Sequence, residues 1–190
     1  MKIPFGLADI TIGTGETAIK FDGENLFQAD AAEISIEPIL EAVNVADFGD
    51  TDYDDFINGY SGEITIVAAQ HTLELMTVSM AYANKIMSAD NATQVGLTDS
   101  RIGTSMRERG LPMTIHPREM EDDTSLDFHL YKVASVGEYS RSYANEQGNN
   151  ELTFKMYPRD GAKANSGSNF YYVGDVDPNA PAPAPTEPTA

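Results

Sequence analysis

Short segments in which apolar and polar residues alternate constrain the fold of this chain more than any other feature. The alternation is clearest over 33–37, 63–66, 126–131 and 151–157. Successive side chains of a strand point to opposite faces, so each segment predicts a strand with one buried and one wet face. Weaker candidates lie at 7–12, 18–21, 111–115 and 133–139, and turn signals such as Asn58-Gly59 and Ser61-Gly62 separate the candidates.

One helix is expected within this pattern. Apolar residues recur at three- and four-residue steps from Leu73 to Met87, with Thr72 placed as N-cap, which predicts a helix over about 72–87. We therefore expect a mainly β fold, either a β-sandwich or a partly closed β-barrel, with one flanking α-helix.

A change of composition near residue 162 divides the chain. Residues 1–161 are expected to form the β domain, and residues 162–190, rich in Gly and Ser and then in Pro and Ala, a flexible C-terminal arm that ends in an extended tail. An aromatic patch of Phe170, Tyr171 and Tyr172 interrupts the arm. Such a patch on a flexible arm is expected to dock onto another surface, so these three residues are candidates for contact between subunits.

Charge is distributed very unevenly. The chain has 12 Lys and Arg against 30 Asp and Glu, a formal net charge of −18, which excludes a nucleic-acid binder held by phosphate contacts. Thirteen of the acids lie between Phe21 and Asn84, a stretch with no Lys or Arg. A molecule with separate anionic and cationic regions favours head-to-tail contact with its own copies. The candidate residues for this contact are Asp47, Asp50, Asp52, Asp54 and Asp55 on one side and Arg101, Arg107 and Arg109 on the other.

Motifs for catalysis or for cofactor binding are lacking. There is no Cys, and the three histidines do not have the spacing of metal ligands. The glycines of 13–15 lead into a short strand instead of the helix that a dinucleotide site needs, and the acidic loop starting at Asp50 lacks the Gly and Glu of a calcium loop. We therefore predict a protein that is not an enzyme, with no catalytic residue, metal or cofactor.

The order and spacing of several short motifs resemble the tail tube proteins of long-tailed bacteriophages and prophages. In the second half these are Leu111 to Arg118, Leu126 to Ala134, Tyr139, and Leu152 to Asp160; in the first half, the strand ending Ile36-Glu37-Pro38, the Gly49-Asp50-Thr51 loop, the 62–67 strand and Thr72-Leu73-Glu74. The resemblance covers roughly residues 5–161. It implies a virion tail protein, assembled in the host cytoplasm, whose hexameric rings stack into a hollow tube that passes DNA and tape-measure protein.

The residues themselves add an expectation about the bore of such a tube. Glu33, Ser35 and Glu37 lie on one face of a strand, and Glu63 and Thr65 on one face of another. If these strands pair, like charges meet across the ladder, and such a face must be wet. An anionic wall without cations would let DNA slide without adhering, so these five residues are candidates for lining the lumen.

Two alternatives remain open. One is a tail-completion or distal tail protein of the same β-barrel class, which forms a single ring. The other is a soluble ligand-binding β-sandwich with Tyr139, Tyr143, Tyr171 and Tyr172 as contacts. The sequence has no apolar stretch of the roughly 20 residues that cross a bilayer, and no apolar leader follows Met1, so no membrane association is expected.

Overall fold

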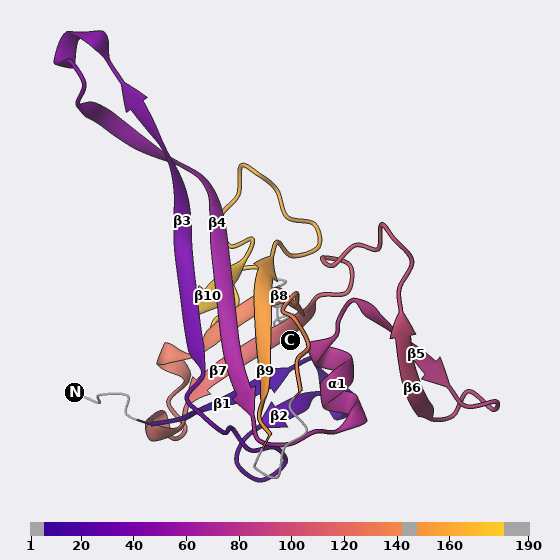
Figure 1. Cartoon of the computed structure of the whole chain (residues 1–190). Coiled ribbons are helices and arrows are strands. Elements are labelled where there is room, and N and C mark those ends of the chain that lie inside the picture. Colours follow the sequence, from indigo (N-terminus) through magenta and orange to yellow (C-terminus); the bar gives the residue numbers. More distant parts are fainter. Residues whose placement is uncertain (1–5, 142–147, 181–190) are drawn as a thin grey trace, which may run out of the picture.

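The strands of this chain form one large antiparallel sheet and one separate hairpin. The computed structural model describes residues 6–141 and 148–180 (Figure 1). The strands are β1 (Ala8–Ile12), β2 (Ile19–Phe21), β3 (Glu33–Asn44), β4 (Asp52–Ala68), β5 (Ala83–Met87), β6 (Gln94–Asp99), β7 (Leu111–Pro117), β8 (Phe128–Ser135), β9 (Asn150–Tyr157) and β10 (Tyr171–Val173). The mainly β fold expected from the alternating segments is confirmed.

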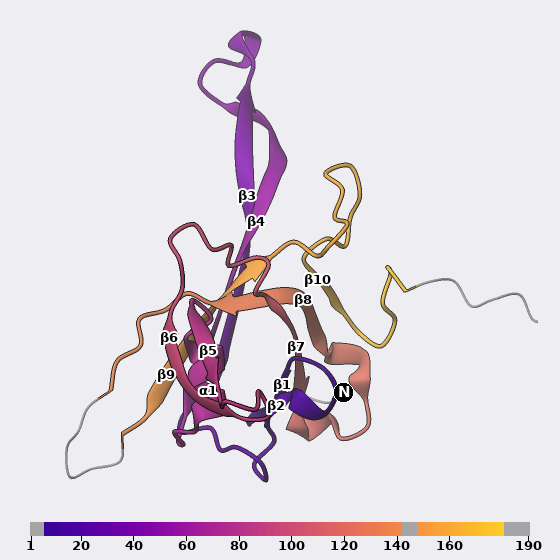
Figure 2. The ribbon, with the colours of Figure 1, turned by 90° about the vertical axis from the view of Figure 1, so that its right-hand side faces the viewer.

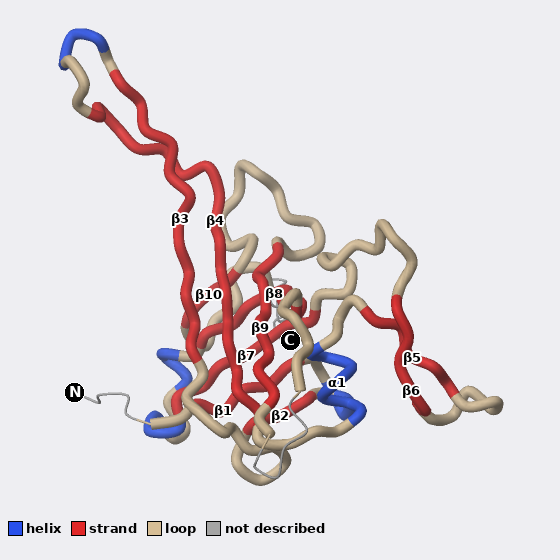
Figure 3. Tube along the Cα trace, viewed as in Figure 1, coloured by secondary structure: helices blue, strands red, loops and turns tan. Residues whose placement is uncertain are grey.

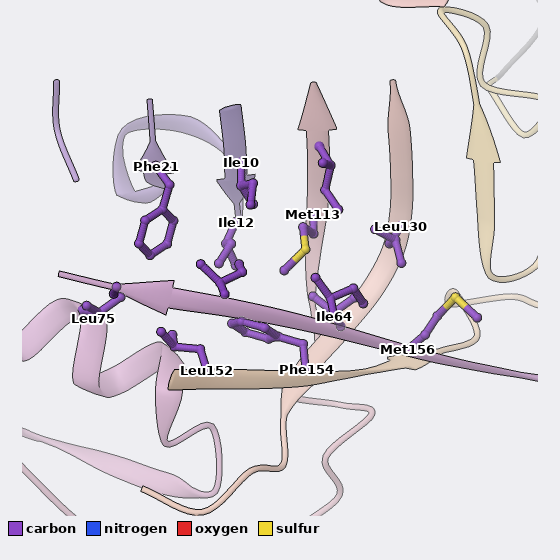
Figure 4. Packing of buried hydrophobic residues seen from close by; sticks show 14 residues of the cluster. Ile10, Ile12, Phe21, Ile64, Leu75, Met113, Leu130, Leu152, Phe154 and Met156 are labelled. Atoms are coloured by element: carbon purple, nitrogen blue, oxygen red, sulfur yellow. The ribbon is translucent and has the colours of Figure 1, made fainter. Parts of the chain in front are cut away.

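Strand β8 joins two halves of the large sheet. The order is β2-β1-β7-β8-β9-β4-β3, and β10 also pairs with β8. Residues Phe128 to Leu130 of β8 pair with both β7 and β10, and Lys132 to Ser135 pair with β9; Val133 also pairs with Leu111 of β7. Strands of the β1 and β7 half therefore cross those of the β4 and β9 half (Figure 4). This is a sandwich-like arrangement with a shared corner strand, and the sheet does not close into a barrel.

The core lies between these two halves. Figure 4 shows Ile10, Ile12, Met113 and Leu130 facing the side chains of β4 and β9. The buried cluster consists of Ile10, Ile12, Phe21, Ile64, Ile66, Ala68, Leu75, Met113, Ile115, Leu130, Val133, Leu152, Phe154 and Met156. Alternation accounts for this set, because the buried residues of β4 and β9 are every second residue along each strand.

The helix is shorter than the sequence predicts. α1 (Leu73–Ser79) begins as expected, with the Thr72 hydroxyl accepting from the Leu75 amide at 3.1 Å, but Met80 leaves the helical conformation. Residues 83–87 form β5 instead. The expected helix over 72–87 was therefore wrong beyond Ser79. The carbonyls of residues 81 and 83 bond the Arg109 guanidinium, which comes from a distant part of the chain.

The turn signals at Asn58-Gly59 and Ser61-Gly62 were also wrong, because both pairs lie inside β4. Asn58 is the extra residue of a bulge, since Ile39 pairs with Gly59 and Leu40 with Ile57. Strands β3 and β4 consequently continue far beyond the sandwich as one long hairpin (Figure 2). A 3-10 turn, Ala46–Phe48, lies at its tip (Figure 3).

Candidate self-association surface

The outer hairpin, residues 39–59, carries a set of uncovered apolar side chains. In a single chain, Ile39, Leu40, Phe48, Tyr53, Phe56 and Ile57 are each 50% to 62% exposed. Leu40 pairs directly with Ile57 across the ladder, and the rings of Phe48 and Tyr53 lie 5.3 Å apart. Burying large side chains of this kind contributes roughly 1.5–3 kcal/mol each. The outer hairpin therefore has the composition of an interface, and nothing in the described chain covers it.

The same outer hairpin carries the acidic residues that the sequence marked for contact between subunits. Asp47, Asp50, Asp52, Asp54 and Asp55 are all exposed there. Three of them belong to β4 itself, so the expected acidic loop is shorter than 47–55. Apolar and anionic side chains thus share one projecting element. A partner surface for it must combine apolar area with positive charge.

Two of the three candidate arginines are engaged within the chain. Arg107 donates to the carbonyls of Pro158 and Arg159 at 3.0 and 2.8 Å and to the Asp160 carboxylate at 3.2 Å. Both Arg107 and Arg109 are only partly exposed, and Arg109 holds the turn between α1 and β5. The structure brings neither arginine near the outer hairpin of its own chain.

Arg101 differs from the other two. Its side chain is exposed and has no hydrogen-bond or ion-pair partner among the described residues. Beside it, Ile102 is fully exposed, at 103%. A free cation next to a free apolar side chain complements the acidic and apolar outer hairpin, so the loop at Arg101 has the chemistry that a partner surface for it needs.

The five residues expected to line a lumen lie on the outer face of the β3–β4 ladder. The register pairs Glu33 with Thr65, Ser35 with Glu63, and Glu37 with Ser61. Carboxylates therefore meet hydroxyl groups directly, and other carboxylates only diagonally. The expectation that like charges face each other across this ladder was wrong, because the strands are offset so that each Glu faces a Ser or a Thr.

The outer face is also not free of cations. Across the next ladder, Glu63 pairs with Lys155 of β9. Lys155 lies outside the stretch from Phe21 to Asn84 that has no Lys or Arg, so the composition of that stretch does not predict it. The face remains acidic overall, with one positive charge beside its centre.

Strand β3 forms an open edge of the sheet. Among the described residues it pairs only with β4, over 12 residues. Natural proteins protect such edges with proline and inward charges, and Pro38 is a residue type confined to edges and bulges. The free backbone groups of β3 can pair with a strand of a second copy.

The aromatic patch of the arm packs on the sheet of its own chain. β10 pairs with β8, and Phe170 and Tyr171 pack against the core. Tyr172 stacks on His129 with ring centroids 4.4 Å apart. Residues 162–169, expected to be a flexible linker, fold on themselves, because Asn169 donates to the carbonyls of Lys163 and Ser166. The Arg159 amide, just after β9, donates to the carbonyl of Asn169 at 2.8 Å and fixes the end of this segment. In the isolated chain the docking surface for the patch is β8.

The ligand-binding alternative is not favoured by the concave surfaces. A concavity of about 1540 Å³ lies between the β1–β2 connection, α1 and the β5–β6 hairpin, and the tyrosines proposed as ligand contacts do not line it. Tyr139 is partly buried, and Tyr143 lies outside the described residues. Within 6–141 and 148–180, no three histidine, aspartate or glutamate side chains gather as a metal site.

Comparison of the chain with protein-family models and with curated proteins finds no match. In the described residues no helix is long and apolar enough to span a bilayer. The apolar surface of the outer hairpin was not predicted from the sequence. Two adjacent apolar pairs in polar surroundings, Ile39-Leu40 and Phe56-Ile57, are the sequence feature that indicates it.

Proposed function

We propose that the chain is a structural virion protein, a tail tube subunit that polymerises as stacked hexameric rings into a hollow conduit for DNA. The observation that carries the proposal is the outer hairpin, an element that leaves the sandwich and exposes six large apolar side chains. A surface of this kind marks a protein interface. The loop at Arg101 and Ile102 has complementary charge and apolar area, so copies of the chain are suitable partners for one another.

The open edge of β3 supports the same proposal. Pairing of this edge with a strand of a neighbouring copy would continue the sheet from subunit to subunit and produce a ring. The outer face of β3 and β4 would then line the bore with Glu33, Ser35, Glu37, Glu63 and Thr65. An acidic lining repels DNA and lowers the number of phosphate contacts that would slow its passage.

Electron microscopy of the concentrated, purified protein tests this function. Tubes support the tail tube assignment, single rings support a tail-completion or distal tail protein, and a monomer at every concentration supports a ligand-binding sandwich. The double variant Leu40→Ser with Ile57→Ser removes an exposed apolar pair and should abolish tubes while the fold is retained. Val95→Ser is a matched control, because Val95 is equally exposed, at 59%, on the separate β5–β6 hairpin.

The two charge assignments are tested with separate variants. Arg101→Glu should prevent polymerisation, and Lys163→Glu, an exposed cation outside the proposed contact, should not. Charge reversal of Arg107 or Arg109 is unsuitable for this purpose, since both side chains hold the fold together. Glu33→Lys with Glu37→Lys should leave tubes intact and slow genome ejection. Ejection at the normal rate would refute the lumen assignment.

A further inference from the structure

The outer hairpin leaves the sandwich at a defined root. Tyr60 of β4, paired with Pro38 of β3, is the last partly covered large side chain before the hairpin becomes exposed. Just beyond it lies the bulge at Asn58, and a second irregularity follows at Tyr53, where Val43 pairs with Asp54 and Asn44 with Asp52.

Bulges bend a ladder and increase its twist. Figures 1 and 3 show the outer part of the hairpin bending away from the direction of its inner part. A two-stranded ribbon with no third strand beside it is only marginally stable on its own. The direction of the outer hairpin therefore depends on what holds its root.

The C-terminal arm packs against this root. Phe170 and Tyr171 both pack on the ring of Tyr60, with centroid distances of 5.6 and 6.3 Å, and Tyr171 meets it edge-on. Aromatic pairs in such tilted arrangements contribute beyond the area they bury. The contact joins the arm to β4 at the residue from which the hairpin projects.

A second set of contacts fastens the arm behind these rings. The Tyr131 hydroxyl donates to the Asp177 carboxylate at 2.6 Å and accepts from the Asn179 amide at 2.7 Å. The same amide donates to the carbonyl of Ser168 at 2.8 Å, which closes the segment on itself. Burial, reinforced by the bond to Asp177, raises the pKa of Tyr131 to about 12, so the hydroxyl keeps its proton at neutral pH.

We propose that the segment 168–179 of the arm is a brace that fixes the direction in which the outer hairpin leaves the sandwich, with Phe170 and Tyr171 as its contact on Tyr60 and Tyr131 as its anchor. The brace is a property of the single chain. It goes beyond the proposed function, because it holds for the free subunit whether or not copies assemble.

Distance measurements between two spin labels test the brace. The chain has no cysteine, so Asp50→Cys at the hairpin tip and Glu119→Cys on the sandwich place two labels at exposed positions. Labelled protein is diluted with unlabelled protein, so that only distances within one chain are recorded. In the full chain the distance distribution should be narrow. With Phe170→Ala added, its width should grow about twofold, because the hairpin then turns about its bulges.

A matched control and a second variant keep the result decisive. Val176→Ala changes a side chain of the same arm that is 73% exposed, and it should leave the distribution unchanged. Circular dichroism melting shows whether Phe170→Ala is folded. If it is not, Tyr131→Phe decides, since it keeps the ring and removes only the hydroxyl that anchors Asp177 and Asn179. An unchanged distribution in a folded Phe170→Ala or Tyr131→Phe variant would overturn the brace, and failure to form tubes would not.

Discussion

Glu63 of β4 lies directly opposite Lys155 of β9 across their antiparallel ladder. On its other side Glu63 faces Ser35, so the carboxylates of Glu33 and Glu37 are its diagonal neighbours. Lys155 therefore lies next to Glu63 on one side, and the two glutamates of β3 lie on the other side of Glu63, one strand further from Lys155. We infer that this lysine offsets part of the repulsion between Glu63 and its diagonal neighbours.

Removal of that cation should destabilise the sheet. Lys155→Gln is expected to cost about 0.2–1 kcal/mol of unfolding free energy, the range for an opposed charge pair in a ladder. Glu33→Gln, which removes one of the repelling carboxylates, should leave stability unchanged or raise it slightly. Urea unfolding of both variants and of the wild-type chain, at low salt and at about 1 M salt, measures these effects. Salt screens exposed charges, so the differences in unfolding free energy should disappear at about 1 M salt. A cost of Lys155→Gln that does not change with salt would contradict the electrostatic explanation.

The N-cap of α1 gives a second prediction. Thr72→Ala removes the acceptor of the Leu75 amide and should lower the free energy of unfolding by about 0.5–2 kcal/mol. Thr14→Ala is the matched control, because Thr14 occupies the N-cap position of the 3-10 turn Gly15–Thr17 without any side-chain bond. Equal losses in the two variants, measured by urea unfolding, would show that the hydroxyl of Thr72 contributes nothing.

A third prediction concerns the close approach of β4 to β9. A Cβ atom at Gly62 would lie 2.8 Å from the Met156 Cε and 3.0 Å from its Cβ, whereas one at Gly59 would come no nearer than 3.6 Å to any neighbour. Gly62→Ala should therefore cost about 1–3 kcal/mol through overpacking. Gly59→Ala should cost clearly less. Thermal unfolding compares the two, and similar melting temperatures would show that Met156 moves aside freely.

The local pattern of the sequence determined much of this architecture. Alternation identified the residues of β4 and β9 that face the core, since period two directly sets the buried face. It was wrong for the segment 126–131, because Leu126 lies exposed in a 3-10 turn and β8 buries Leu130 together with Val133 to Ser135. The end of the helix was missed because it depends on Arg109, more than 20 residues away, whose guanidinium bonds the carbonyl groups of Ala81 and Ala83.

The long hairpin and the charge register were missed for related reasons. Asn58-Gly59 is a turn signal in isolation, but a bulge places both residues within β4. Strand order and register determine which residue of β3 faces Glu63, and they also place Lys155 beside it. Local residue patterns do not fix either of these.

A pH-sensitive contact lies at the end of β7. His116 Nδ1 lies 2.6 Å from the Asp127 carboxylate, and its Nε2 lies 2.8 Å from the carbonyl oxygen of Glu121. Both ring nitrogens thus face acceptors, which requires the doubly protonated imidazolium. The bond to Asp127, which outweighs partial burial, raises the pKa of His116 above its ordinary value of 6.5, and Asp9 on the adjacent strand, itself paired with Arg118, adds to the effect.

The sign of the resulting pH dependence follows from this raised pKa. A group whose pKa is higher in the folded than in the unfolded chain stabilises the fold fully at pH values below its unfolded pKa. This stabilisation is lost as the pH rises through its folded pKa. We expect the melting temperature to fall as pH is raised from below 6.5 through the elevated pKa of His116. His116→Gln should remove this part of the dependence, because glutamine does not titrate. Thermal unfolding over this interval, together with NMR titration of the His116 ring, measures both. If the melting temperature of the wild-type chain changes with pH no more than that of His116→Gln, the imidazolium contributes no stability. Loss of its proton would then weaken the contact with Asp127 without any cost to the folded chain.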